Sequence, residues 1–142
     1  MNPVTQVALQ DVLDWYATLS RDSLPRCREF YTLDARFKDP FNDVAGIAAI
    51  ENIFTHMFDH TERPRFVIRE VLNNDDRAFI SWDFEFWIKG TRYVVQGASR
   101  LLFDDHGKVM DHRDYWDPAE ELWSKMPIIG GVVTWLRERF AA

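Results

Sequence analysis

Two segments of the chain carry apolar residues at steps of three and four, the spacing of an amphipathic helix with one buried face. The first runs from about Thr5 to Ser20, and its apolar positions are Val7, Ala8, Val12, Trp15, Tyr16 and Leu19. The second runs from Gly46 to about Asp59 and places on one face Ile47, Ile50, Phe54, Met57 and Phe58. We predict a long helix in each segment, with a short helix over 23–31 and an extended stretch over 35–38 between them.

After Pro64 the apolar residues alternate with polar ones, which is the period of a β-strand with one buried face. The clearest run places on one face Ala78, Ile80, Trp82, Phe84, Phe86 and Ile88. The opposite face of that run carries Phe79, Ser81, Asp83, Glu85 and Trp87. Four strands fit, over about 65–73, 77–88, 92–103 and 108–116, and the connections contain the Asn, Asp and Gly of tight turns. The pattern therefore predicts an antiparallel meander.

The last part of the chain returns to helical signals. Asp117 occupies an N-cap position, Pro118 the first helical position, and Glu120 the third residue after the cap, which predicts a short helix to about Lys125. A final amphipathic segment, 128–140, is expected to pack across the sheet or against a partner. Helices followed by a long meander indicate an α+β fold, in which a curved antiparallel sheet wraps as a cone around the N-terminal helices, with an extra C-terminal helix.

Composition narrows the class of protein. The 142 residues include 17 basic and 23 acidic ones without any Lys or Arg run, which argues against nucleic acid as a partner. Eleven Phe and six Trp favour an aromatic-walled cavity, although a Phe-rich core would also account for them. The single cysteine, Cys27, has no Cys or His neighbour and is interpreted as structural, although the flanking arginines would lower its pKa.

The sequence shows no signal for export or for a membrane. The first residues lack the basic and apolar regions of a secretory signal, and the longest apolar stretch, 128–136, is shorter than the roughly 20 residues that span a bilayer. We expect a cytoplasmic protein with no membrane partner.

Several short motifs occur in a recognisable order along the chain. They are Phe30-Tyr31-x-x-Asp34-Ala35, Asp39-Pro40, Gly46-x-x-x-Ile50, Phe103-Asp-Asp-His-Gly107 and Tyr115-Trp116. In order and spacing they resemble the nuclear transport factor 2-like superfamily, specifically its SnoaL-like and ketosteroid isomerase-like branch. The resemblance implies a cystatin-like α+β barrel and one SnoaL-like domain over 1–142, with a core of about 5–117 and a C-terminal helical extension of about 118–142.

Asp39 is the first candidate catalytic residue. The resemblance implies that it is the general base, because the isomerase base lies in the same Asp-Pro context. A carboxylate beside an apolar wall has a raised pKa and can accept a proton near neutral pH. The alternative is that Asp39 only ends a strand and caps the turn that follows.

The isomerase also needs two oxyanion donors, and here the resemblance holds only in part. Aligned without gaps, the helix donor falls on Trp15, with Tyr16 beside it, and the strand donor falls on Ser99. An indole and a hydroxyl each donate one hydrogen bond, but neither matches the acidity of the isomerase pair. Steroid isomerisation is therefore not expected.

The last strand carries a second polar pair. By period two, Met110, His112, Asp114 and Trp116 share one face, and the resemblance places this face inward. We predict that His112 and Asp114 are catalytic partners opposite Asp39, with Asp114 orienting His112. The alternatives are a pair that only satisfies itself, or the opposite parity with Asp111 and Arg113 inside.

The remaining cavity wall is predicted from the inward faces of the strands, from both long helices and from Tyr31. Its ligand-binding residues are Trp15, Tyr16, Tyr31, Phe54, Trp82, Phe84, Phe86, Val95, Gly97, Ser99 and Trp116. Gly97 is expected to leave room for a ligand. His56 and His60 stand four apart on helix two, but no third ligand is apparent, and we expect no metal site.

Two functions remain open. One is a cofactor-independent isomerase, cyclase or hydrolase in which Asp39 moves a proton on a hydrophobic carbonyl or epoxide compound. The other is a non-catalytic module of the same fold that binds a hydrophobic small molecule or serves dimerisation. The outer sheet face, with Phe79, Trp87, Val94 and Leu102 among polar residues, is too apolar for a fully solvated surface and predicts a homodimer through that face.

Overall fold

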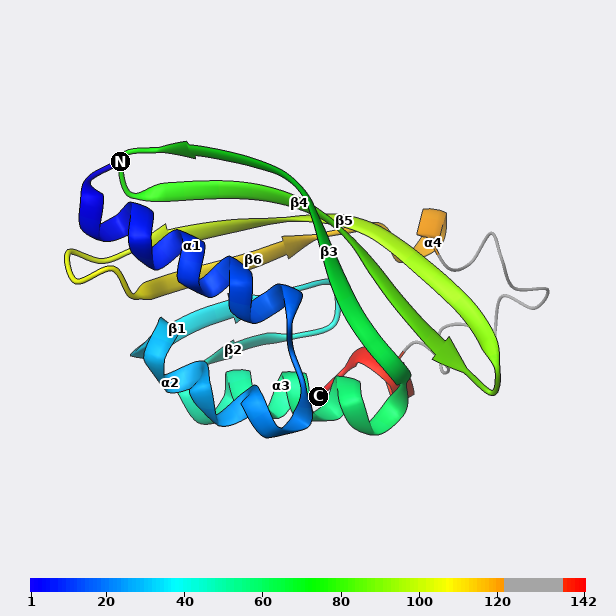
Figure 1. Cartoon of the computed structure of the whole chain (residues 1–142). Helices are drawn as coiled ribbons and strands as arrows, with labels where there is room; N and C mark the ends of the chain where they lie inside the picture. The colour runs from blue at the N-terminus through cyan, green and yellow to red at the C-terminus, as the bar shows by residue number, and fades with distance from the viewer. Residues whose placement is uncertain (122–136) are drawn as a thin grey trace.

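The computed structural model describes residues 1–121 and 137–142. Its elements, in chain order, are α1 Pro3–Ala17, η1 Arg21–Arg26, α2 Cys27–Phe30, β1 Tyr31–Lys38, β2 Asp43–Ala45, α3 Ile47–His60, β3 Glu62–Asn74, β4 Arg77–Ile88, β5 Thr91–Phe103, β6 Val109–Tyr115 and α4 Pro118–Glu121. The sheet curves over α1 and α3, which lie on one side of it (Figure 1). The predicted α+β cone is confirmed.

The first helix begins earlier and ends earlier than the apolar spacing predicts. The side chain of Asn2 accepts a hydrogen bond from the backbone N–H of Thr5 at 2.8 Å, and Pro3 follows at the first helical position, so the helix begins at Pro3. Ser20 and Ser23 then form a capping box that starts a separate 3₁₀ turn, η1. The predicted short helix over 23–31 is therefore η1 followed by the single turn α2.

The sheet has six strands in the order β2-β1-β6-β5-β4-β3. The meander from β3 to β6 is antiparallel, as predicted, and the face of β4 from Ala78 to Ile88 is buried. The sequence did not predict β2, or the parallel pairing of β1 with β6. That parallel pair brings the end of β1, and with it Asp39, beside the last strand.

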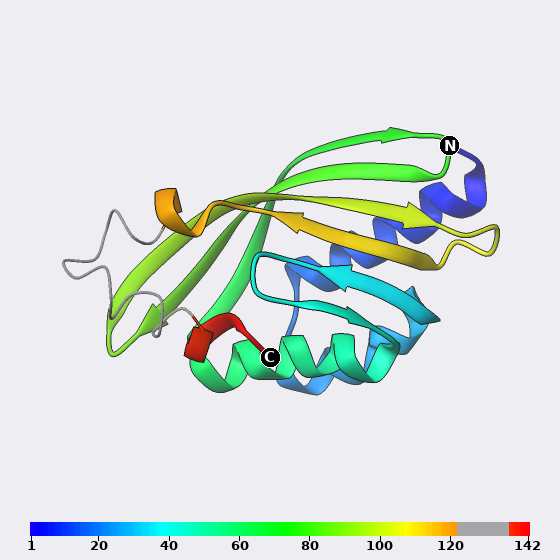
Figure 2. The same cartoon turned by 180° about the vertical axis from the view of Figure 1, so that it is seen from behind.

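The C-terminal predictions are tested only in part. The Asp117 carboxylate accepts a hydrogen bond from the backbone N–H of Ala119 at 2.9 Å and begins α4. The predicted continuation to Lys125 and most of the segment 128–140 lie outside the described residues. Residues 137–142 pack beside α3, near the turn between β1 and β2 (Figure 2).

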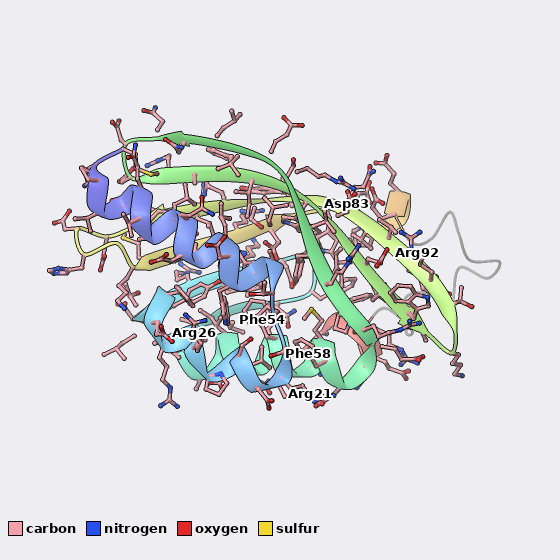
Figure 3. The ribbon with its side chains drawn as sticks, in the orientation of Figure 1. Arg21, Arg26, Phe54, Phe58, Asp83 and Arg92 are labelled. Atoms are coloured by element: carbon pink, nitrogen blue, oxygen red, sulfur yellow. The ribbon has the colours of Figure 1, made fainter. Side chains whose placement is uncertain are left out.

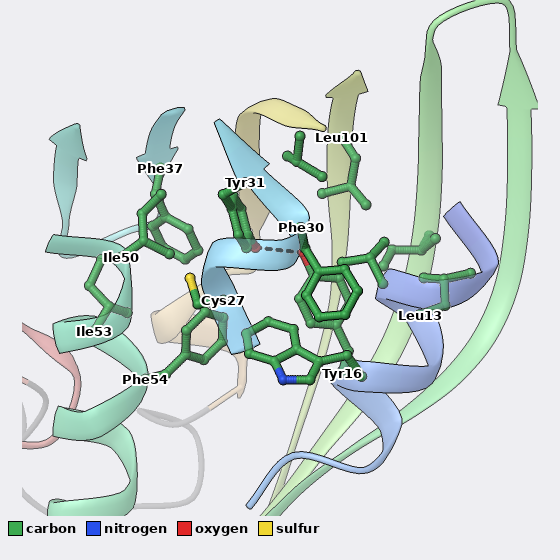
Figure 4. Close-up of a cluster of buried hydrophobic side chains, with 14 of the residues drawn as sticks. Leu13, Tyr16, Cys27, Phe30, Tyr31, Phe37, Ile50, Ile53, Phe54 and Leu101 are labelled. Atoms are coloured by element: carbon green, nitrogen blue, oxygen red, sulfur yellow. Dashed lines mark hydrogen bonds between the residues drawn. The ribbon is translucent and has the colours of Figure 1, made fainter. Parts of the chain in front are cut away.

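The core fills the space between the helices and the inner face of the sheet. Figure 4 shows Tyr16, Tyr31, Cys27 and Phe54 meeting there. Cys27 is fully buried, and burial raises the pKa of its thiol to about 12, so desolvation outweighs the flanking arginines. None of the described helices is long and apolar enough to cross a membrane.

Candidate functional site

Two adjacent cavities lie between the helices and the inner face of the sheet. Both are lined by Phe54, Phe66, Trp82 and Asp114, so Asp114 stands where they meet. The space open to the centre of a water molecule is about 20 Å³ in the inner cavity and about 60 Å³ in the outer one. The inner cavity therefore has room for about one water molecule, and the outer one for a few.

The inner cavity is bordered by a chain of buried hydroxyl and imidazole groups. The Tyr31 hydroxyl lies 2.7 Å from Nδ1 of His112, and the Tyr16 hydroxyl lies 2.5 Å from that of Tyr31 (Figure 4). Burial is the main cause that raises the pKa values of both tyrosines well above the ordinary value. Both hydroxyls therefore keep their protons.

Asp114 lies at the other end of this series of hydrogen bonds. Its Oδ1 lies 2.6 Å from Nε2 of His112 and accepts a hydrogen bond from the Ser99 hydroxyl at 2.5 Å. The indole N–H of Trp82 donates to the Ser99 oxygen at 2.9 Å. Because a carboxylate only accepts, Nε2 carries the proton of a neutral His112, and Nδ1 then accepts from Tyr31. All the donors point toward Asp114, whose Oδ2 has no hydrogen-bond partner in 1–121 or 137–142.

Asp39 follows β1 and lines the outer cavity together with Asp114. Its Oδ1 accepts hydrogen bonds from the backbone N–H groups of Phe41 at 2.8 Å and Asn42 at 2.7 Å. The Asn42 side-chain amide donates to both carboxylate oxygens at 3.1 Å. Asp39 thus caps the turn, as one alternative predicted, and also faces the cavity.

The charge of Asp39 is destabilised by its surroundings. Burial, and secondarily the nearby Asp114, raise the pKa of its carboxyl from 3.8 to about 6, against the opposing effect of the hydrogen bonds from Phe41 and Asn42. An appreciable fraction of Asp39 is therefore protonated near neutral pH, which an exposed aspartate is not.

With this geometry established, comparison with known proteins identifies the family. A family model of the SnoaL-like domain matches residues 12–112. The chain belongs to the SnoaL-like domain family. A search of curated proteins finds no match.

Solved structures show the same fold at low sequence identity. An epoxide hydrolase of M. tuberculosis described as LEH-like superposes with a TM-score of 0.72 at 16% identity, over 94% of this chain and 95% of that one. A steroid delta-isomerase of Pseudomonas aeruginosa gives 0.67 at 17% identity, over 98% and 93%. A Jannaschia sp. CCS1 protein, assigned only provisionally as a SnoaL-like polyketide cyclase, gives 0.72 at 17% identity, over 84% and 92%.

In this SnoaL-like domain the predicted parity of the last strand holds at His112 and Asp114. His112 is buried and Asp114 lines both cavities, while Asp111 pairs with Arg100 on the outer face. Met110 does not share their face, because a bulge makes Val109, not Met110, the partner of Phe103. The prediction of an inward Met110 is wrong, and its side chain is 41% exposed.

Four predicted wall residues border neither cavity: Gly97, which is described below, and three larger side chains. The indole N–H of Trp15 donates to the backbone carbonyl of Ser23 at 2.9 Å, so this side chain belongs to the core. Tyr31 lies behind Tyr16 and His112, and Phe86 is fully buried behind Phe84. The predicted residues that do line a cavity are Tyr16, Asp39, Phe54, Trp82, Phe84, Val95, Ser99, His112, Asp114 and Trp116.

Gly97 does not leave room for a ligand. A Cβ at this position would lie within 3.0 Å of three carbon atoms of the Trp82 ring. The space that a side chain at position 97 would take is therefore filled by the Trp82 indole, which is held there by its hydrogen bond to Ser99.

Sequence reasoning missed part of the wall. Phe66 and Ile68 come from β3, whose alternation is interrupted by a bulge between Ile68 and Glu70. Phe140 lies outside the resemblance, and its place at the cavity follows only from the tertiary structure. Ile80 and Met57 were predictable, because Ile80 shares the inward face of β4 with Trp82 and Met57 shares the apolar face of α3 with Phe54.

The two histidines of α3 do not form part of this site. The rings of His56 and His60 stack with centroids 3.9 Å apart, and Nδ1 of His60 donates to the backbone carbonyl of His56 at 2.8 Å. Within the described ranges no three His, Cys, Asp or Glu side chains are grouped so that they could hold a metal ion.

Proposed function

We propose that this SnoaL-like domain is a cofactor-independent acid–base enzyme, an isomerase, cyclase or hydrolase that acts on a hydrophobic carbonyl or epoxide compound. Asp39 is its general base. The observation that supports this most directly is a carboxyl with a pKa of about 6 in the wall of an aromatic cavity. A general base is most effective when its pKa lies near the working pH.

The two oxygens of Asp39 have different roles in this proposal. Oδ1 accepts two backbone hydrogen bonds and one from Asn42, so it holds the side chain in place. Within the described residues Oδ2 accepts a single hydrogen bond, from Asn42 at 3.1 Å, and it is the oxygen that takes up a proton. Asp39 accepts that proton from a substrate carbon or from water, and returns it to the product or to solvent.

Asp114 and His112 have a separate role in this proposal, which is to bind an oxygen atom. Asp114 lies at the junction of the cavities, and its Oδ2 is not engaged by the hydrogen bonds that orient Oδ1. We assign to this pair the binding of a water molecule or a substrate oxygen. Two carboxyl groups in one cavity do not ionise independently, which is why the charge of Asp114 contributes to the raised pKa of Asp39.

The second candidate is a non-catalytic ligand-binding or dimerisation module, and one observation favours it. Both groups aligned with the isomerase oxyanion donors are already engaged: Trp15 donates to Ser23, and the Ser99 hydroxyl donates to Asp114. An enolate intermediate would therefore need another donor. The engagement of both donors therefore favours the module, and among the enzymatic reactions it disfavours steroid isomerisation.

A paired screen separates the two candidates. Wild-type protein and Asp39→Asn are incubated with hydrophobic ketones and epoxides, and both ligand binding and product formation are measured. We expect wild type to form a product that Asp39→Asn does not form, while both bind the compound. Asp43→Asn removes an exposed carboxylate on β2 and is the matched control. Binding without turnover in wild type supports the module instead.

We also propose that the outer sheet face forms a homodimer. Phe79 is 48% exposed there. Glu85 pairs with Arg65 at 3.2 Å and with Arg92 at 2.6 Å on this face, and Figure 3 shows Asp83 and Arg92 on the side of the sheet away from the helices. Such pairs neutralise charges on the face that also exposes Phe79. A mass in solution that equals one chain at all concentrations would refute the dimer.

A further inference from the structure

The last residues of the chain form part of the wall of the outer cavity. Phe140 lines it together with Asp39 and Asp114. The ring of Phe140 contacts Phe86 with centroids 5.5 Å apart and Trp116 with centroids 5.6 Å apart, in each case edge to face. An aromatic residue far along the chain thus completes a wall that β4 and the end of β6 begin.

Hydrogen bonds from the side chains of Asn42 and His56 to the backbone fix the segment that carries Phe140. The Asn42 side-chain amide donates to the carbonyl of Phe140 at 2.9 Å, and its oxygen accepts from the N–H of Ala142 at 2.8 Å. Nε2 of His56 lies 3.1 Å from the carbonyl of Glu138. The residues 137–142 are therefore tied both to α3 and to the turn after β1 (Figure 2).

Asn42 connects this wall to the carboxylate of Asp39. Its side chain is buried, and the amide nitrogen that donates to Phe140 also donates to both oxygens of Asp39. A single side chain therefore contacts both the carboxylate and the backbone of the residue that carries the aromatic ring, and both residues line the same cavity.

We propose that residues 137–142, called the terminal wall below, close the outer cavity, and that Phe140, anchored by Asn42, is the residue that limits the size of the ligand it accepts. The proposal rests on the proposed function only in taking this cavity as the ligand site. The outer cavity offers only about 60 Å³ to the centre of a water molecule, so the side chains of its wall limit the size of a ligand. Phe140→Ala removes a phenyl group from this wall. The enlarged space, lined by aromatic side chains, should accept one more ring.

Two neutral probes of different size test this. Dissociation constants for phenol and for 2-naphthol are measured by calorimetry on wild type and Phe140→Ala. We expect the preference for 2-naphthol over phenol to rise at least about tenfold in Phe140→Ala, which corresponds to about 1.4 kcal/mol. Phe58→Ala is the matched control, because Phe58 is a partly buried phenylalanine that packs on the core and lines neither cavity.

The outcomes distinguish this proposal from the proposed function. An unchanged preference in a folded Phe140→Ala, or the same rise in Phe58→Ala, overturns the assignment of Phe140. If Phe140→Ala does not fold, Phe140→Leu should show a smaller rise in the same direction, and an unchanged value there overturns it equally. The preference should also rise in Asn42→Ala, which keeps the ring but removes its anchor, and an unchanged value there would overturn the role of Asn42. None of these results depends on turnover, whereas the proposed function fails if Asp39→Asn leaves product formation intact.

Discussion

Replacing Asp39 by asparagine should stabilise the folded protein at neutral pH, and this advantage should shrink as the pH falls. In wild type the folded state must ionise a carboxyl whose pKa is raised to about 6 by burial and by Asp114, whereas the unfolded chain ionises it near 3.8. The folded state therefore binds the proton more tightly than the unfolded state does. Stability contributed by this group is present below the unfolded pKa and is lost as the pH rises through the folded pKa.

The size of the effect follows from the shift. About two pKa units correspond to about 3 kcal/mol of lost stability above pH 7. Asparagine carries no charge, and its amide oxygen still accepts the backbone hydrogen bonds from Phe41 and Asn42. Its amide nitrogen, however, faces the amide nitrogen of Asn42, and the lost hydrogen bond costs about 1 kcal/mol. We expect Asp39→Asn to be more stable than wild type by about 2 kcal/mol at pH 7.5.

The assay is urea unfolding of both proteins at pH 7.5 and pH 5.0. The stability difference should fall by about 1.4 kcal/mol between these pH values, because wild-type Asp39 becomes protonated in the folded state while the unfolded chain stays ionised. Groups that titrate identically in the two proteins cancel in this difference. Asp43→Asn reports the effect of removing an exposed carboxylate.

A difference between Asp39→Asn and wild type that stays constant with pH would refute the reasoning. So would a carbon NMR titration of the Asp39 carboxyl that gives its ordinary pKa. Either result would show that this carboxylate is solvated in the folded protein, and Asp39 would lose the property on which its role as a base rests.

Three further changes test the packing, the buried network and the dimer. Gly97→Ala should destabilise the protein by about 1–3 kcal/mol in urea unfolding, because the new methyl group overlaps the Trp82 ring; an unchanged midpoint would mean that the indole can move aside. Tyr31→Phe should cost about 1–2 kcal/mol by the same assay, since it removes the hydroxyl that lies 2.7 Å from Nδ1 of His112; a neutral effect would indicate that another group replaces it. Phe79→Asp should shift the protein from dimer to monomer in sedimentation at micromolar concentration, and an unchanged mass would exclude this face as the interface.

Much of the fold could be predicted because its signals are local. The steps of three and four in α1 and α3, and the alternation along β4, depend only on which residues must be buried. β2 could not be predicted in this way, because three residues of mixed exposure carry no period. The parallel pairing of β1 with β6 was also missed, since it joins strands separated by most of the chain.

Alternation predicted that His112 and Asp114 share one face of the last strand, and the family resemblance implied that this face points inward. The position of Met110 was not predictable in this way. A bulge adds one residue to β6 and reverses the parity on its far side, and the backbone geometry that decides this is not encoded in a pattern of apolar letters. Gly97 was misread for a related reason. A glycine signals close approach, but only the packed sheet shows that the approaching group is Trp82.

The sequence by itself determined the class of fold, the family and the strand faces, because these follow from short-range periodicity and from motifs within a few residues of each other. Only the tertiary structure decided the pKa and the orientation of the Asp39 carboxyl. Its raised pKa depends on burial and on Asp114, 75 positions away, and its orientation depends on Asn42. The wall of the same cavity is completed by Phe140. Desolvation and charge act through space, so the chemistry of this carboxylate is set only when distant segments of the chain come together.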